Sequence, residues 1–299
     1  MFLKFFGLQE EPFGVTPDPR FLYLGRGHRE ALASLEYGIR AARGFIALVA
    51  KPGLGKTILL FHLLERYANV ARTAFLFQTQ CNSQEFMRYL LGDLGFDVWQ
   101  PDFVQVHEKL NKLLVREASA GKSFIVVVDE AQNLAPPVLE TVRLLSNFET
   151  PRAKLLQIIL AGQPELADKL VRPELAQLRQ RVSALIRLEP FTAAETGHYI
   201  DHRLHQAGYR GGQLFTPEAR KIIAARSEGI PRMINHVCFN ALSLGYAMGR
   251  KVINTSIVRE VTLDLDFESV VSNPRAGHSP AVETGTAPAD SRGVPAAVV

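Results

Sequence analysis

The sequence predicts an α/β fold in which a five-stranded parallel sheet carries helices on both faces and is followed by a small all-helical domain. Five short runs rich in β-branched and aromatic residues alternate with helical patterns. These runs are continuously apolar, which is typical of strands buried on both faces of a parallel sheet. After the last run, only helical patterns occur. The expected strands are residues 45–50, 73–79, 123–131, 155–162 and 183–191.

The composition is that of a folded protein without a membrane span. The 299 residues are 47% hydrophobic and 21% charged, which suffices for one large core or two domains. The longest apolar runs are strand-sized, well below the roughly 18 residues that cross a bilayer. Cys81 and Cys238 are far apart and offer no disulfide framework or zinc site, so we expect a reducing, cytoplasmic location. The net charge of +4 permits contact with nucleic acid or anionic lipid without requiring it.

The predicted domain division follows these patterns. Residues 1–191 form the sheet domain, which includes an N-terminal segment, residues 1–44; we expect the start of this segment, MFLKFFGLQEEPFG, to pack on the domain. Residues 192–268 form a helical lid domain. Its first helix opens with the capping box TAAE, and its second opens with Thr before Pro in TPEA. Residues 269–299, rich in Pro, Ala, Gly and Ser, are expected to be a disordered tail.

The stretch AKPGLGKT differs from the phosphate-loop pattern G-x-x-x-x-G-K-[ST] at one position, where Ala50 replaces the usual first glycine. Alanine is the smallest available substitute at this turn. An apolar strand precedes the stretch and an apolar-periodic helix follows it, as a phosphate loop requires. Gly53 and Gly55 let backbone N–H groups close around phosphate oxygens. Lys56 then reaches the β- and γ-phosphates, and the hydroxyl of Thr57 binds Mg²⁺.

Two adjacent carboxylates follow the buried run FIVVV. The carboxyl edge of a parallel sheet is where its ligands bind, so we expect Asp129 to hold Mg²⁺ and Glu130 to polarise the attacking water. Gln163 follows the next strand and is expected to contact the γ-phosphate or orient that water. The residues expected to contact the nucleotide are Ala50, Lys51, Pro52, Gly53, Leu54, Gly55, Lys56, Thr57 and Asp129.

Arginines are expected to complete the charge of the site. Arg181, with Arg179 as the second choice, lies just before the last strand, where a subunit can insert an arginine into the site of its neighbour. Arg232 follows a Gly-Ile-Pro turn in the lid and is expected to contact the γ-phosphate and couple hydrolysis to lid movement.

These motifs, together with the segments TPDPRFLYLGRGHREAL, LETVRLLSNFET and LLQIILAGQPEL, resemble the AAA+ ATPases of the general secretion pathway protein A type, also called ExeA-like. The likeness covers about residues 1–265. It implies a P-loop NTPase AAA+ module with the loop strand between the fourth and fifth strands, and ATP with Mg²⁺ between sheet domain and lid in a homo-oligomer. It also places Leu24 and His28 beside the adenine and ribose.

Family members implicated in secretion carry a membrane helix and a peptidoglycan-binding domain after the lid. The tail here has neither, and we expect this chain not to reach the cell wall itself. Related stand-alone ATPases accompany exopolysaccharide, protein-sorting or transposition systems.

Three functions therefore stay open at this point. The first is an ATP-hydrolysing motor or switch that acts on secretion or export assemblies at the inner face of the membrane. The second is an ATP-dependent DNA-binding oligomer, and the third is a nucleotide-gated scaffold with little turnover.

Overall fold

The computed structural model describes residues 2–14, 16–77, 79–96, 103–149 and 154–272, and it confirms the predicted sheet. Five parallel strands are ordered β2-β3-β4-β1-β5, so the loop strand β1 lies between β4 and β5 as expected. The strands are β1 (Phe45–Ala50), β2 (Ala71–Leu76), β3 (Ser123–Val128), β4 (Gln157–Gly162) and β5 (Val182–Leu188).

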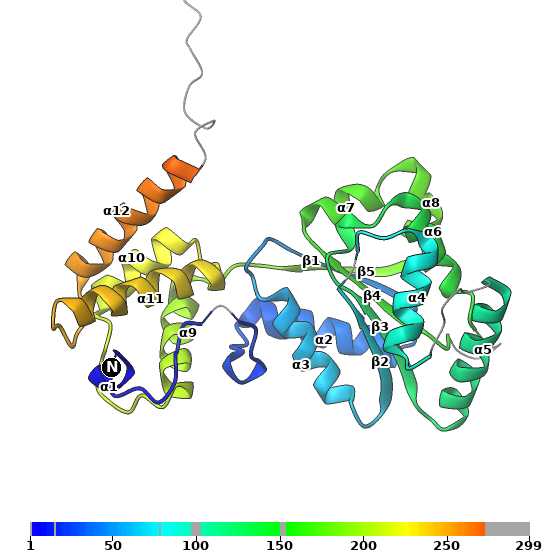
Figure 1. The fold of residues 1–299 in the computed structure, drawn as a ribbon, viewed down its shortest axis with the longest axis horizontal. Coiled ribbons are helices and arrows are strands. Elements are labelled where there is room, and N and C mark those ends of the chain that lie inside the picture. Colours follow the sequence, from blue (N-terminus) through cyan, green and yellow to red (C-terminus); the bar gives the residue numbers. More distant parts are fainter. Residues whose placement is uncertain (1, 15, 78, 97–102, 150–153, 273–299) are drawn as a thin grey trace, which may run out of the picture.

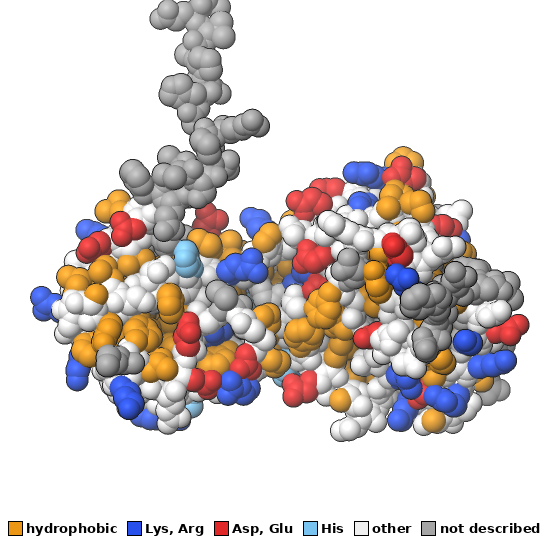
Figure 2. Space-filling view, in the orientation of Figure 1, with side chains coloured by type: hydrophobic (Ala, Val, Ile, Leu, Met, Phe, Trp, Pro, Cys, Tyr) orange, Lys and Arg blue, Asp and Glu red, His pale blue; other side chains and the backbone are white. Residues whose placement is uncertain are grey.

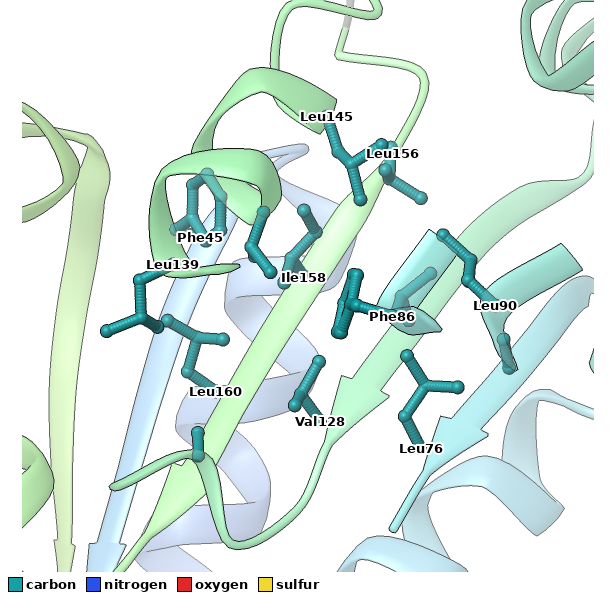
Figure 3. Packing of buried hydrophobic residues seen from close by; sticks show 14 of the residues in the cluster. Phe45, Leu76, Phe86, Leu90, Val128, Leu139, Leu145, Leu156, Ile158 and Leu160 are labelled. Carbon is teal, nitrogen blue, oxygen red and sulfur yellow. The ribbon is translucent and has the colours of Figure 1, made fainter. Parts of the chain in front are cut away.

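Helices cover both faces of this sheet (Figure 1). Successive strand residues point to opposite faces. In β1, for example, Phe45 and Ala47 pack on one face, and Ile46 and Leu48 pack on the other. Figure 3 shows the first of these cores, in which side chains of α4 and α6 meet those of the strands. The helices of this region are α2 (Arg26–Arg40), α3 (Lys56–Tyr67), α4 (Ser83–Asp93), α5 (Phe103–Ser119), α6 (Pro136–Leu145), α7 (Pro164–Leu170) and α8 (Ala176–Arg181).

Three strands end earlier than the sequence pattern predicts. Strand β2 was predicted at 73–79 and lies at Ala71–Leu76, because this edge strand pairs only with β3, whose last paired residue is Val128. Strands β3 and β5 were predicted to continue to residues 131 and 191. In both places the chain turns away from the sheet to build the candidate site.

After β5, the described residues form four helices, which make their own bundle with a separate apolar core. The predicted capping box between Thr192 and Glu195 is confirmed, and so is the N-cap of Thr216, whose side chain accepts the N–H of Ala219. We propose the domain boundary between β5 and the first of these helices. Within the described ranges, no helix combines the length and apolarity needed to cross a bilayer. The four helices are α9 (Ala193–Gln206), α10 (Pro217–Ser227), α11 (Pro231–Ala247) and α12 (Thr255–Ser272).

The predicted tail begins within α12, since this helix continues to Ser272. Residues 273–299, the rest of the predicted tail, lie outside the described residues.

The N-terminal segment packs on the helical bundle rather than on the sheet domain, which corrects the expectation for its first residues. Helix α1 (Phe2–Phe6) lies beside α11 (Figure 1), and the ring of Phe5 lies 5.3 Å from that of Tyr246. Phe13 and Phe21 belong to the same apolar core as the bundle. The apolar pattern of this segment shows that it is buried, but it does not show which partner buries it.

A hydrogen bond from α2 to Glu195 joins the sheet domain to the bundle. Glu195 Oε1 accepts the N–H of Arg26 at 2.6 Å, and Oε2 accepts the N–H of Thr192 at 2.9 Å. The carboxylate therefore caps its own helix and the first turn of α2, whose N-cap residue Gly25 has no side chain to do so. Partial burial raises the pKa of Glu195, but these backbone hydrogen bonds outweigh it and hold the pKa below the ordinary 4.5.

We expect Glu195→Gln to lower the melting temperature at neutral pH, with a difference from the unaltered chain that disappears in acid. A carboxylate with a lowered folded-state pKa stabilises fully above its unfolded pKa and loses this effect as pH falls through the folded value. Thermal melts from pH 7 down to pH 3 measure the difference. Glu218→Gln, in the exposed first turn of α10, is the matched control. A Glu195→Gln difference that stays constant over this pH range would contradict the role of the charge.

Candidate functional site

The loop between β1 and α3 has the backbone that its glycines predict. Gly53 and Gly55 have φ values of 83° and 90°, which L residues with a side chain rarely adopt. Ala50, the position that departs from the common pattern, is instead the last residue of β1 and pairs with Leu188 of β5. It is not among the described residues with positive φ. A methyl group therefore fits there without backbone strain.

The predicted lysine, threonine and carboxylates come together at the carboxyl edge of the sheet. Lys56 Nζ donates to Asp129 Oδ1 and, at 3.0 Å, to Glu130 Oε1. Thr57 Oγ1 donates to Asp129 Oδ2 at 2.7 Å. Lys56 and Asp129 are buried, with 8% and 2% of their surface exposed. The Lys56 ammonium group is therefore charged and lies at the edge of the sheet, where it can also donate to the oxygens of a triphosphate.

The oxygen atoms of Thr57 and Asp129 fit Mg²⁺. This ion prefers oxygen ligands and takes one or two from the protein, and it completes its shell with phosphate oxygens and water. One hydroxyl and one carboxylate, 2.7 Å apart beside the phosphate loop, form such a pair. Among the described residues, no three His, Cys, Asp or Glu side chains converge as a self-sufficient metal cage. Thr57 and Asp129 would therefore hold Mg²⁺ when a nucleotide supplies further oxygen ligands.

Glu130 is held by three side chains. Its Oε1 accepts from Lys56, and its Oε2 accepts from Gln132 Nε2 at 2.6 Å and from Gln163 Nε2 at 3.2 Å. Partial burial raises the pKa of Glu130, but the hydrogen bonds from Gln132 and Lys56 outweigh it, so the pKa lies below the usual range. Glu130 also has a φ of 53°. Its carboxylate is ionised at neutral pH and oriented by its neighbours.

Gln132 is a residue that the sequence analysis missed. Its Nε2 donates to Glu130, and its Oε1 accepts the backbone N–H of Gln163 at 3.1 Å. It thus ties the acid after β3 to the residue after β4. The sequence signal that could have identified Gln132 is its position two residues after Glu130, in the short turn Ala131–Asn133.

A cavity of about 230 Å³ lies beside these groups, between the phosphate loop, the N-terminal segment and the helical bundle. Loop and bundle touch directly here, because the backbone N–H of Arg232 donates to the carbonyl of Gly53 at 3.2 Å. A Cβ on Gly53 would lie 2.8 Å from that of Arg232. Arg232 lines the cavity and its side chain is exposed. Glu130 and Gln163 line the cavity as well.

The lining of the cavity also includes residues that the sequence analysis did not identify. Arg203 of α9 is buried, and its Nη2 donates to the carbonyl of Gly14 at 3.3 Å. Its guanidinium lies 4.5 Å from the ring centroid of Phe21. Tyr199 donates to Asn235 Oδ1 at 2.8 Å. This part of the lining therefore combines aromatic and polar groups, as small-molecule sites commonly do.

Of the two residues expected beside adenine and ribose, His28 lines the cavity and Leu24 does not. His28 Nε2 lies 2.9 Å from the carbonyl oxygen of Leu54 in the loop. Burial lowers the pKa of His28, which favours the neutral ring.

Arg179 and Arg181 lie away from this cavity. Arg181 Nη1 donates to Ser146 Oγ and, at 2.8 Å, to Asn147 Oδ1, and Arg179 donates to the carbonyl of Val171 at 3.0 Å. A role for either arginine in catalysis therefore requires the cavity of a neighbouring chain.

Comparison with known proteins agrees with this fold. Residues 39–170 match a family model described as an AAA domain. Over 260 residues the chain is 37% identical to general secretion pathway protein A of Aeromonas hydrophila, a match that covers 86% of this chain and 47% of that protein. It is 27% identical over 160 residues to an uncharacterized HTH-type transcriptional regulator of Methanocaldococcus jannaschii, covering 52% of this chain and 38% of that protein. The chain spans less than half the length of these curated relatives.

Two solved structures share the fold at low sequence identity. The ORC2 protein of Aeropyrum pernix, in ADPNP–ADP complexes, has a TM-score of 0.66 at 17% identity and matches 86% of this chain and 72% of its own. Cdc6p of Pyrobaculum aerophilum has a TM-score of 0.64 at 18% identity and matches 85% and 70%.

Proposed function

Because the chain belongs to the AAA+ proteins of the general secretion pathway protein A type, we propose that it binds ATP with Mg²⁺ and hydrolyses it as an oligomeric motor or switch. The work it would do is the assembly of a secretion or export system, at the inner face of the membrane. The observation that carries this proposal is the contact of Lys56, Thr57, Asp129 and Glu130 at the edge of a cavity that the helical bundle closes.

Each residue has a role that its position supports. The N–H groups around Gly53 and Gly55 would bind phosphate oxygens, and Lys56 would turn from the carboxylates toward the β- and γ-phosphates. Thr57 and Asp129 would hold Mg²⁺, which supplies charge neutralisation at the phosphates when bound. Glu130 would accept a proton from the attacking water, with Gln163 beside it. Arg232 would reach the γ-phosphate from the bundle.

Gln132 would act as a positioning residue for Glu130. We expect Gln132→Ala to lower kcat for ATP hydrolysis by roughly 10- to 100-fold, because misplacement of a catalytic group by about 1 Å costs up to this much. KM for ATP should stay nearly unchanged, since Gln132 does not line the cavity. Steady-state ATPase assays over a range of ATP concentrations measure both constants. Gln105→Ala, on the exposed side of α5, is the control; a rise in KM with unchanged kcat would contradict the positioning role.

Hydrolysis in an oligomer predicts that two inactive variants can restore each other. Arg181→Ala keeps its own cavity intact, and Glu130→Gln keeps its arginine. We expect each variant alone to lose about 100-fold or more of the ATPase activity. Mixing them creates interfaces in which an intact cavity meets an intact Arg181, so the mixture should regain activity.

The control mixture combines Glu130→Gln with the double variant Glu130→Gln/Arg181→Ala, which creates no intact interface. A test mixture no more active than this control would remove Arg181 from catalysis, and Arg179→Ala would then take its place in the test. An unaltered chain that binds ATP tightly but shows no turnover at high protein concentration would instead support the nucleotide-gated scaffold.

DNA binding is a second candidate, favoured by the pI of about 9.1 and by the partial match to an HTH-type transcriptional regulator. It predicts that duplex DNA binds in the presence of ATP and is released by salt, because phosphate contacts displace counterions. Absence of binding at low salt would eliminate it.

A further inference from the structure

One face of the helical bundle exposes large apolar side chains from two separate segments. These are α1 and the end of α11 together with the turn that follows it. Phe239 and Tyr246 of α11 have 38% and 36% of their surface exposed, and Met248 and Val252 each have 49% exposed. Figure 2 shows hydrophobic side chains gathered on the helical bundle, at the left of the view, with basic and acidic side chains around them. Adjoining exposed apolar residues of this kind mark an interaction surface.

Aromatic contacts hold this face in place. The ring of Phe2 lies 6.3 Å from that of Phe239 and 6.3 Å from that of Tyr246. Phe5 packs edge-on against Tyr246 at 5.3 Å. Phe2 and Phe5 are only partly buried by these contacts. The rings therefore hold one another in place before any partner binds, and part of each ring stays exposed to solvent.

The two segments that form this face carry charge of one sign. Residues 2–8 and 239–252 contain Lys4, Arg250 and Lys251 but no aspartate or glutamate. All three cations are exposed, and within the described part of the chain none of them forms an ion pair. Lys251 Nζ lies 5.8 Å from the ring centroid of Phe5, so charge and aromatic surface adjoin. We name the surface formed by the exposed side chains of residues 2–5 and 239–252 the aromatic-basic face.

We propose that the aromatic-basic face docks on a membrane surface that carries anionic phospholipid headgroups. Aromatic side chains favour the boundary between headgroups and acyl chains, and lysine and arginine beside them pair with headgroup phosphates. A protein interface also needs directional hydrogen bonds, about one per 100–200 Å². Here the exposed side chains are mostly apolar or cationic, which suits a fluid, negatively charged surface better. This inference goes beyond the proposed ATPase activity and does not depend on it.

Vesicle flotation of the full chain tests the proposal. One set of vesicles contains phosphatidylcholine alone, and the other contains phosphatidylcholine with phosphatidylglycerol. Each cation near an anionic surface strengthens binding by about fivefold, so Lys4, Arg250 and Lys251 together should favour the anionic vesicles by about 100-fold. Binding should weaken as salt is raised. Equal binding to both vesicles, or binding to neither, would overturn the proposal.

Charge reversal locates the binding surface. Lys4→Glu/Lys251→Glu should weaken binding to the anionic vesicles by about 25-fold or more. The matched control is Lys112→Glu/Lys122→Glu, which makes the same change in net charge at exposed positions on α5 and before β3, and it should bind like the unaltered chain. If the two double variants bind equally, the proposal is wrong.

A second variant tests whether vesicle binding can be lost while the fold is kept. Met248→Ser/Val252→Ser changes side chains that are half exposed, so the fold should tolerate it while vesicle binding falls. Sedimentation measured without vesicles completes the test. A dimer that dissociates on Lys4→Glu/Lys251→Glu, in a chain that does not float, would assign this face to a second copy and overturn the lipid proposal.

Discussion

Replacing Glu130 by glutamine is expected to lower kcat for ATP hydrolysis by about 100-fold or more, with little change in ATP affinity. The amide keeps the size of the side chain but cannot accept a proton, and general-base catalysis contributes about 10²- to 10⁴-fold. The structure makes this carboxylate available for the role, because Lys56, Gln132 and Gln163 orient it and its lowered pKa keeps it unprotonated at neutral pH. Steady-state turnover and titration with a fluorescent ATP analogue measure the two quantities.

Glu108→Gln provides the control for this experiment, since it makes the same chemical change at an exposed position on α5. It should hydrolyse ATP at the unaltered rate. Equal turnover of Glu130→Gln and Glu108→Gln would exclude Glu130 as the catalytic base. A loss of ATP affinity without a loss of kcat would place Glu130 in binding instead.

Replacing Gly229 by alanine is expected to lower the stability of the chain by about 3 kcal/mol or more. Gly229 has a φ of 69°, and a Cβ there would lie 1.9 Å from the carbonyl oxygen of Phe191. The two backbones are also joined, because Phe191 N–H donates to Gly229 O at 2.9 Å. A methyl group would therefore force the start of α11 away from the link between β5 and α9. The melting temperature, followed by circular dichroism, should fall by roughly 6 °C or more.

Gly249→Ala separates the clash from the backbone strain. Gly249 has a similar φ of 66°, but a Cβ there would meet no atom within 4 Å beyond its chain neighbours. It should lose only the cost of a left-handed alanine, about 1 kcal/mol. If both alanine variants melt at the same temperature, the contact between residues 191 and 229 does not limit stability.

The sheet and the phosphate loop could be predicted because local sequence determines them. A strand buried on both faces must be apolar throughout, and a loop that surrounds phosphate needs glycine at left-handed positions. The capping boxes could be predicted for the same reason, since each forms within four consecutive residues. These features fixed the position of Lys56, Thr57, Asp129 and Glu130 at one edge of the sheet.

The other parts of the site depend on contacts between distant segments. Gln132 matters because β3 and β4 are neighbours, so that its side chain reaches both Glu130 and Gln163. Arg203 matters because the chain near Gly14 lies on α9. The bounds of β2 were predicted wrongly because they depend on where its partner strand β3 begins and ends. Neither periodicity nor motif spacing contains such information.

The packing of the N-terminal segment on the helical bundle gives the molecule two covalent connections between its lobes. The chain leaves the bundle core after Phe21 to enter α2, and it returns through Phe191 after β5. A single covalent connection would allow the helical bundle to rotate about any axis through that connection relative to the sheet domain. Two connections favour a hinge movement. Rotation of the bundle about the line through both connections leaves each of them unstretched, whereas rotation about any other axis would stretch at least one.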